Sequence, residues 1–552
     1  MPKPACAIIA AYLIVSLPAG AAPVAPGPSL AERIDASLAP LYRSDTPGAA
    51  VIVVKDGKTV FRKAYGLADV AKKQALTPDT ALRIGSITKQ FTATAILMLM
   101  EEGKLRLDDD ITRHLPGYPT HGKRITIEHL LTHTSGIPSY TGKPSYMADM
   151  AKDMTVAEMI DTFKNDPLEF APGAVWRYDN SGYFLLGAII EKVSGQTYAA
   201  FLQQRIFTPL GMTHTAYEGH ERRAFPHAQG YSPDATGWRP SPRLSMTQPY
   251  AAGALVSSVD DLARWDAAVS SGKLLTPANW QRAFTPYTLD DGTRTGYGYG
   301  WEITTLRGVP QVSHGGAITG FRSYALRLPE QHIYVAVLNN ADAGVVSPDG
   351  PALRAAAIAL DKPFPEYRAI ALAPARLDAY TGRYRGGDKA DWTVRRSGDK
   401  LTMQAVSGPL IPLQAFSDNG FFAPGSVHWV EFRRDARGEV ADLVLHLGDS
   451  ASVKPRVGTV AARKAVPISH AAFDARAGRY LFPQGLVIEL TREGDRLFAQ
   501  ATNQGKLEIH ALSDNAFFSD EVDAEMHFDD ADPVNGVVLV QGGQVMPGTR
   551  LR

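Results

Sequence analysis

The C-terminal third of the chain repeats itself at a constant spacing, and this repeat constrains the fold more than any other feature. Asp378 recurs as Asp474, 96 residues further on. The same offset relates Gly382-Arg383-Tyr384 to Gly478-Arg479-Tyr480, Gly398-Asp399 to Gly494-Asp495, and Ser417-Asp418-Asn419 to Ser513-Asp514-Asn515. One offset shared by several separate matches indicates one structural unit used twice. Short alternating segments with turn residues between them predict a small antiparallel barrel or sandwich. We therefore expect two related antiparallel β domains, at 377–463 and 471–552.

The length and net charge of the chain limit the number of domains and the classes of partner that can be expected. With 552 residues it is too long for one hydrophobic core, so several domains are expected. Lys plus Arg and Asp plus Glu number 57 each, and 45% of the residues are hydrophobic, as in ordinary globular proteins. Because positive charge is not in excess, neither nucleic acid nor an anionic membrane surface is expected as a partner.

Residues 1–21 predict a cleavable secretory signal peptide. Lys3 supplies the positive start, Ala5 to Leu17 the apolar core, and Ala19-Gly20-Ala21 the small-residue cleavage site. A membrane anchor is the alternative, but the apolar run is shorter than the ~20 residues that cross a bilayer. The single cysteine, Cys6, lies inside this segment, so disulfides and cysteine-bound zinc are excluded from the mature chain. We expect a periplasmic or secreted protein without a membrane span.

Residues 29–362 predict an α+β domain. The pattern indicates, in order, an amphipathic helix, a two-stranded hairpin, three antiparallel strands and a closing helix, at 29–39, 49–65, 311–339 and 350–360. The proline-spaced segment that follows, 363–376, is expected to be a linker to the first repeat unit.

Within this domain, Ser86 and Lys89 stand three residues apart at the start of an apolar run, Gln90–Met100. If the run is a helix, both side chains project from one face, one turn apart. Ser86 then lies near the helix N-terminus, where unpaired N–H groups favour developing negative charge. A buried lysine with a lowered pKa can remove the proton of a serine. The pair predicts a nucleophile and its base, although this spacing alone is common by chance.

Tyr178 and Asn180 are candidate partners of this pair. They lie ahead of a helix that the sequence predicts at Phe184–Val193. A Tyr178 phenolate is the alternative to Lys89 as proton acceptor, and Asn180 is expected to orient Lys89 and a substrate amide. Taken singly, Tyr178 also fits an ordinary core aromatic.

His314-Gly315-Gly316 supplies the last element of the predicted site. The two glycines let a substrate lie against a strand edge, so His314 and Gly316 are expected to bind substrate. The backbone N–H groups of Ser86 and Ala317 would then form an oxyanion hole for a tetrahedral intermediate. Taken alone, His314 also fits a histidine in a turn.

His129 and His133 raise the possibility of a metal site, because two histidines four apart share a face of a helix. The zinc-protease pattern requires a glutamate directly after the first histidine, and Leu130 stands there instead. We therefore interpret this segment as a structural turn and expect neither a metal nor an organic cofactor.

Taken together, these motifs resemble the serine hydrolases that include class C β-lactamases, penicillin-binding D-Ala-D-Ala carboxypeptidases, D-aminopeptidases and related esterases. The resemblance covers about 31–360. It is carried by Arg83-Ile84-Gly85-Ser86-Ile87-Thr88-Lys89-Gln90-Phe91, Leu130 to Gly136, Tyr178 to Tyr183, Pro209-Leu210-Gly211-Met212, and Ser313 to Gly316. It implies a β-lactamase/transpeptidase-like domain, an antiparallel sheet flanked by helices with a helical subdomain. It also implies that Ser86 is acylated, that Lys89 and Tyr178 transfer protons, and that Asn180 binds the amide.

The chain departs from the β-lactamase pattern at the third motif. Most β-lactamases and carboxypeptidases have Lys-Thr-Gly where this chain has His314-Gly315-Gly316, and a neutral histidine holds a substrate carboxylate poorly. A histidine there, followed by two repeated β domains, is similar to D-aminopeptidases, whose two β-barrel domains can narrow the active site. This resemblance implies that the units at 377–463 and 471–552 are lipocalin-like β-barrels. We expect a hydrolase of small amides or peptides with D-residues. The alternatives are an esterase, a D-Ala-D-Ala carboxypeptidase or β-lactamase, and a cell-wall peptide-binding protein without catalysis. The oligomeric state is left open.

Overall fold

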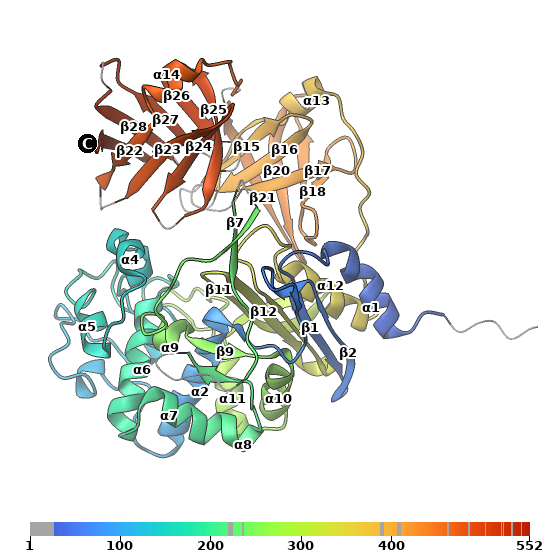
Figure 1. Ribbon diagram of the computed structural model, residues 1–552. Helices are drawn as coiled ribbons and strands as arrows, with labels where there is room; N and C mark the ends of the chain where they lie inside the picture. The colour runs from blue at the N-terminus through green and yellow to red at the C-terminus, as the bar shows by residue number, and fades with distance from the viewer. Residues whose placement is uncertain are drawn as a thin grey trace, which may run out of the picture.

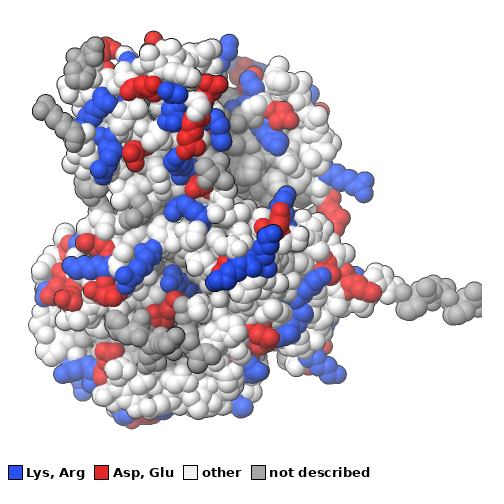
Figure 2. All heavy atoms as spheres, viewed as in Figure 1, with Lys and Arg blue, Asp and Glu red and all other residues white. Residues whose placement is uncertain are grey.

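The computed structural model shows one lobe built on an antiparallel sheet and, above it, two barrels (Figure 1). It describes residues 27–551 apart from 219–224, 235–236, 387–390, 406–409, 461–462, 484–485, 503, 520–521, 523, 532–533 and 542–543. The predicted signal peptide, with Cys6, lies outside the described residues. Among those described, no helix is both long and apolar enough to cross a membrane. On the face shown in Figure 2, acidic and basic side chains are interspersed.

A six-stranded antiparallel sheet forms the centre of the first lobe, in the order β10-β11-β12-β13-β1-β2. Its strands are β1 (Ala49–Lys55), β2 (Lys58–Tyr65), β10 (Glu302–Leu306), β11 (Val309–Ile318), β12 (Phe321–Leu328) and β13 (Ile333–Asn339). Asp56 and Gly57 both adopt positive φ angles, 52° and 71°, as a two-residue hairpin turn requires. The predicted hairpin and three antiparallel strands are therefore confirmed, and the two groups join in one sheet through β1 and β13.

Each face of this sheet is covered by its own core. Ala49, Val51 and Val53 of β1 pack with α1 (Leu30–Leu38) and α12 (Asp349–Ala359), whereas Ala50 and Ile52 pack into the larger core on the opposite face. Side chains along a strand alternate between faces, so a continuous apolar strand serves two cores. The larger core contains α2 (Thr88–Glu101), α6 (Asn180–Ser194) and α10 (Val259–Ser270).

Short helices and strands complete the lobe beside this core. The helices are α3 (Ile127–Leu131), α4 (Pro144–Asp149), α5 (Val156–Asp161), α7 (Tyr198–Leu202), α8 (Thr208–Leu210), α9 (Tyr250–Gly253) and α11 (Pro277–Ala283). The strands are β3 (Leu67–Asp69), β4 (Gln74–Ala75), β5 (Leu82–Arg83), β6 (Ala216–Tyr217), β7 (Tyr231–Asp234), β8 (Gly237–Pro240) and β9 (Leu255–Ser257). Most of these helices gather on the α6 side, which gives the helical subdomain that the family resemblance implied (Figure 1).

The repeated units fold as two closed barrels of eight antiparallel strands. Barrel 1 comprises β14 (Gly382–Tyr384), β15 (Trp392–Ser397), β16 (Lys400–Ala405), β17 (Ile411–Ala415), β18 (Gly420–Phe422), β19 (Trp429–Arg434), β20 (Val440–Leu447) and β21 (Ser450–Gly458). Barrel 2 comprises β22 (Gly478–Leu481), β23 (Val487–Glu493), β24 (Arg496–Ala501), β25 (Lys506–Ser513), β26 (Ala516–Ser519), β27 (Ala524–Phe528), β28 (Gly536–Gln541) and β29 (Gln544–Arg550). A short helix precedes each barrel, α13 (Pro374–Asp378) and α14 (His470–Asp474).

Equivalent side chains perform equivalent tasks in the two barrels. Tyr384 and Tyr480 are both fully buried, and each hydroxyl donates to a backbone carbonyl four residues earlier at 2.7 Å. Asp378 and Asp474 each accept a hydrogen bond from an arginine 18 residues later. The two units at the 96-residue offset therefore share a pattern of side-chain contacts as well as residue identities.

Barrel 1 docks closely on the sheet lobe. Val427 belongs to the same hydrophobic core as α1 and α12. Asp449, in the β20–β21 turn, accepts a hydrogen bond from Gly308 N at 2.7 Å, and His428 Nε2 lies 3.6 Å from Asp349 Oδ2 at the start of α12. Barrel 2 touches the lobe at Gly505, where an added Cβ would lie 2.8 Å from Asp234 in β7.

Candidate active site

Ser86 lies in a single turn of 3₁₀ helix, Gly85–Ile87, that runs directly into α2. The prediction of a helix after Ser86 is confirmed, with Ser86 two residues ahead of its first residue. Gly85 has a φ of +50°, and an added Cβ would lie 3.0 Å from the backbone nitrogen of Ala317. The Ser86 turn is therefore pressed against β11 where the two predicted oxyanion-hole residues meet.

Lys89 is fully buried, because α2 is enclosed by protein on all sides. Its Nζ lies 3.0 Å from Ser86 Oγ, 2.8 Å from Asn180 Oδ1 and 2.9 Å from Ala252 O. Burial lowers the pKa of this lysine to about 7, with the charge of Asp179 acting in the opposite direction. An ammonium can donate to all three oxygens. A neutral amine can donate to the amide and the carbonyl and accept the proton of Ser86. Both protonation states therefore fit the same geometry.

Tyr178 packs its ring beside Lys89, with the ring centroid 4.8 Å from Nζ. Burial raises the pKa of its phenol well above the usual range, and the nearby Ser86 hydroxyl opposes this only partly. The Tyr178 hydroxyl is buried without a hydrogen-bond partner of normal geometry among the described residues. A phenolate is thus disfavoured, and between the two predicted proton acceptors the geometry favours Lys89.

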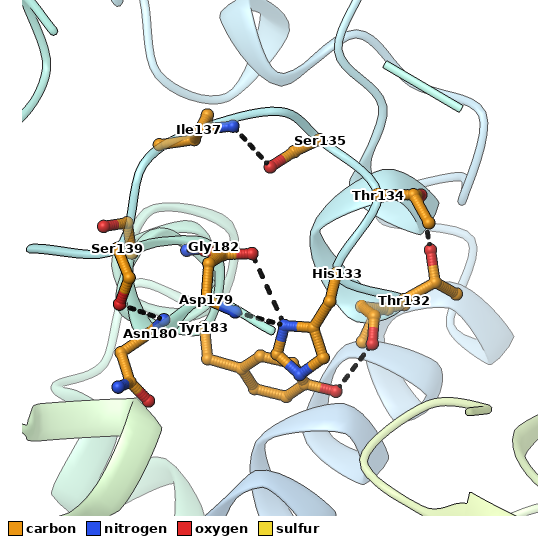
Figure 3. Close-up of polar contacts among 12 residues, drawn as sticks. Thr132, His133, Thr134, Ser135, Ile137, Ser139, Asp179, Asn180, Gly182 and Tyr183 are labelled. Carbon is orange, nitrogen blue, oxygen red and sulfur yellow. Dashed lines mark hydrogen bonds and ion pairs between the residues drawn. The ribbon is translucent and has the colours of Figure 1, made fainter. Parts of the chain in front are cut away.

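Asn180 is the first residue of α6, which starts four residues earlier than predicted because Asp179 caps it. The Asp179 carboxylate accepts the backbone N–H of Gly182, satisfying a donor that the helix start leaves free. Asn180 Nδ2 donates to Thr141 Oγ1 at 3.0 Å. The Asn180 backbone N–H donates to Ser139 Oγ at 3.1 Å (Figure 3). The amide oxygen is thereby aimed at Lys89.

His133 lies behind this helix start, fully buried, with Nδ1 facing Asp179 (Figure 3). Its ring packs among Tyr178, Tyr183 and Tyr297, with centroids 4.3 to 5.1 Å away. Helix α3 ends at Leu131, so His133 does not share a helical face with His129. The Nδ1 atom of His129 instead accepts the N–H of Thr126 at the start of α3.

The strand β11 presents a free backbone edge to Ser86. Its neighbour β10 reaches only as far as Ser313, so the residues from His314 onward pair with β12 alone. Gly316 lies where a Cβ would be 2.1 Å from the Ile84 carbonyl, so only glycine fits, whereas a Cβ at Gly315 would have 3.5 Å to its nearest atom. Gly316 therefore lets the strand approach the Ser86 turn.

His314 is buried on this strand and is uncharged. Burial, reinforced by the nearby charge of Lys89, lowers its pKa to about 3. Its Nδ1 lies 2.6 Å from Gly315 O and its Nε2 lies 2.8 Å from Tyr297 Oη. A carbonyl only accepts hydrogen bonds, so the proton lies on Nδ1 and the Tyr297 hydroxyl donates to Nε2. Both ring nitrogens thus have protein partners, and a role in substrate binding stays a prediction.

Two cavities meet at Ser86. The large cavity, about 1050 Å³, is lined by Ser86, Tyr178, Asn180, His314, Gly316 and Ala317, and by the barrel 1 residues His428 and Leu447–Ser450. The small cavity, about 280 Å³, is also lined by Ser86, Asn180 and Ala317. Six of the predicted site residues therefore line this space and Lys89 contacts Ser86 behind it, while barrel 1 covers part of the large cavity.

The sequence did not single out three residues that shape this site. Tyr297 fixes the tautomer of His314, Glu302 contributes a carboxylate to the large cavity, and Asp449 anchors the barrel 1 turn. Glu302 directly follows the aromatic and glycine segment 297–301, but no spacing rule links it to Ser86. Only the folded sheet brings these residues together.

A serine next to a buried lysine of lowered pKa, on a sheet flanked by helices, defines a serine hydrolase. The chain belongs to the β-lactamase family, whose model, described as "Beta-lactamase", matches residues 30–360. A second model, described as a domain of unknown function (DUF3471), matches residues 367–459, which include the whole of barrel 1.

Individual relatives extend this result. Penicillin-binding protein 4* of Bacillus subtilis (strain 168) is 30% identical over 69% of this chain and 89% of its own length. The octameric penicillin-binding protein homologue of Pyrococcus abyssi is 29% identical, with a TM-score of 0.55 over 77% of this chain and 99% of its own. The D-amino acid amidase of Ochrobactrum anthropi SV3 is 27% identical, with a TM-score of 0.53 over 60% and 97%. The expected family resemblance and fold class are confirmed.

Proposed function

We propose that this protein is an exported serine hydrolase that cleaves small amides or peptides, with D-residues on the acyl side, through a covalent ester of Ser86. The observation that carries the proposal is the triple contact of Lys89 Nζ with Ser86, Asn180 and Ala252. It suits a base that must lose and regain a proton without moving.

In the proposed first step, neutral Lys89 takes the Ser86 proton as Oγ bonds to the substrate carbonyl carbon. The backbone N–H groups of Ser86 and Ala317 hold the resulting oxyanion. The amide C–N bond then breaks. Tyr178 gives its proton to the leaving nitrogen and receives one from the Lys89 ammonium, so the protein regains its starting protonation. A water molecule, deprotonated by Lys89, then attacks the ester carbonyl carbon; as the bond to Ser86 Oγ breaks, the Lys89 ammonium returns the proton to Oγ, which releases the acid and restores Ser86 and neutral Lys89.

Two observations support an amide rather than a β-lactam or a peptide carboxylate as substrate. His314 is uncharged and engaged at both nitrogens, so it supplies no fixed positive charge for a carboxylate. A D-amino acid amidase is among the solved structures that the chain resembles. The signal-like residues 1–21 support export, which N-terminal sequencing of the mature protein from fractionated cells would test.

The test compares D-alanine p-nitroanilide, its L-enantiomer and the matched D-alanine p-nitrophenyl ester on the purified protein. We expect turnover of the D-anilide, and complete loss in Ser86→Ala with an unchanged melting temperature. Turnover of the ester without the anilide would assign an esterase instead. Turnover that survives in Ser86→Ala would overturn the mechanism.

A further inference from the structure

The two cavities at Ser86 differ in their access to the proton donor. Ser86, Asn180 and Ala317 line both cavities, but among the described residues Tyr178 lines the large one and not the small one. In acyl transfer the departing nitrogen must lie within hydrogen-bond reach of the group that protonates it. The leaving part of the substrate therefore enters the large cavity, and the acyl part faces the small one.

The small cavity suits an uncharged acyl side chain. Tyr140, Tyr146, Leu244, Pro249 and Ile318 line it, and none of the described residues in its wall is charged. Its volume of about 280 Å³ is near the lower end for ligand sites. Any discrimination between charged and uncharged substrate groups at this site must therefore come from residues of the large cavity.

Most of the charged groups in the large cavity already have partners. Asp349 faces His428 and accepts from Ser347, and the carboxylate of Asp449 accepts the N–H of Gly308. Arg322 donates through Nε to a backbone carbonyl.

Glu302 is the exception. It is the first residue of β10 and pairs with Ser313 of β11. Glu302 therefore lies next to the point where the free edge of β11 begins, at His314. Its carboxylate makes no hydrogen bond or ion pair with any residue that the structure describes. Three tyrosines, Tyr178, Tyr297 and Tyr324, lie near enough for its charge to raise the pKa of each phenol.

The surroundings of Glu302 make its negative charge unfavourable without a partner. Burial raises the pKa of this carboxyl to about 6, and a carboxylate removed from water needs a counter-charge or several hydrogen bonds. No cation of the described protein supplies this. The side chain is nevertheless open to the cavity that receives the leaving group. A cationic group on the substrate would complete the site.

We propose that Glu302 binds a positively charged group on the leaving part of the substrate, so that the preferred substrates are amides whose departing amine carries a second, cationic amine. This inference rests on the proposed amide hydrolysis at Ser86. It adds a specificity-determining residue and narrows the substrate class to peptides with a basic residue after the cleaved bond.

The experiment uses two peptides of nearly equal shape, D-Ala-D-Lys amide and D-Ala-D-norleucine amide. Both lack a C-terminal carboxylate, and they differ in the terminal ammonium. We expect kcat/KM to be about tenfold higher for the lysine peptide, which corresponds to ~1.4 kcal/mol. In Glu302→Gln the ratio should fall to about one. Glu330→Gln, which removes an equal charge at an exposed position after β12, should keep the full ratio.

A second measurement does not depend on how the variant folds. D-Lysinamide and D-norleucinamide mimic the departing amines, and on the wild-type protein the former should inhibit about tenfold more strongly. Equal inhibition, equal cleavage of both peptides, or an unchanged ratio in Glu302→Gln would overturn the role of Glu302. If the protein cleaves neither of the two peptides and also fails to cleave D-alanine p-nitroanilide, the proposed amide hydrolysis itself is overturned.

Discussion

Replacing Asn180 with Asp tests Lys89 as the base, because it places a negative charge at the atom that now lies 2.8 Å from Lys89 Nζ. The negative charge of a carboxylate is shared by two oxygens, so its centre lies farther from Nζ than the nearer oxygen does. Two opposite charges about 4 Å apart interact by ~4 kcal/mol at an effective dielectric constant of 20. One pKa unit corresponds to about 1.36 kcal/mol. The substitution should therefore raise the pKa of Lys89 by about 2 to 3 units from its value of about 7.

The consequence is a displaced pH profile. Only neutral Lys89 accepts the Ser86 proton, so kcat/KM of the wild type should fall about tenfold per pH unit below pH 7 and level off above it. In Asn180→Asp the rising limb of the profile, where kcat/KM increases with pH as Lys89 loses its proton, should lie near pH 9 to 10. At pH 7 this variant should be about 100- to 1000-fold slower than wild type, and it should recover much of the loss at high pH.

The assay is hydrolysis of a p-nitrophenyl ester without ionisable groups, with Ser86→Ala measuring the background at each pH. Asn180→Ala is the matched control: it removes the same amide but adds no charge, so its limb should not move above pH 7. An Asn180→Asp profile whose limb stays near pH 7 would refute Lys89 as the titrating base. An equal upward shift in both variants would refute the electrostatic explanation.

Three further substitutions test separate parts of the site. Tyr178→Phe should lower kcat by about 100- to 10,000-fold and leave the melting temperature unchanged, since the lost hydroxyl has no partner among the described residues; a drop in stability would contradict this. Gly316→Ala should lower kcat/KM at least 100-fold by pushing on the Ile84 carbonyl, whereas Gly315→Ala should stay within about threefold; equal effects would refute the close approach. Asp449→Ala should free the barrel 1 turn and lower KM for tetrapeptides while changing kcat for D-alanine p-nitroanilide less than twofold; unchanged KM for the longer substrate would contradict a covering role.

The sequence predicted the elements whose causes are local. The Asp56-Gly57 hairpin, the helix after Ser86 and the antiparallel β character of both repeated units follow from turn residues and from periodicity within a few positions. The predicted start of α6 at Phe184 was wrong by four residues. Gly182 looks like a helix breaker in the sequence, yet its N–H is the donor that Asp179 accepts, so it is part of the cap.

Features that depend on distant segments could not be predicted. The third acceptor of Lys89, the Ala252 carbonyl, lies 163 residues away. The hydroxyl that fixes the His314 tautomer comes from Tyr297, in a segment with no recognisable link to the third motif. The pKa of Lys89 likewise follows from how completely α2 is enclosed, a property of the packed core that no local pattern encodes.

The two barrels show how one repeated unit acquires unequal roles. Core positions keep their character at the 96-residue offset, as Phe432 and Phe528 do, because each barrel must fill its own interior. The residues that dock barrel 1 on the site are under no such constraint: His428, which faces Asp349, corresponds to Ala524 in barrel 2. Barrel 1 therefore lines the cavity at Ser86 because of its surface residues, and not because of the fold that it shares with barrel 2.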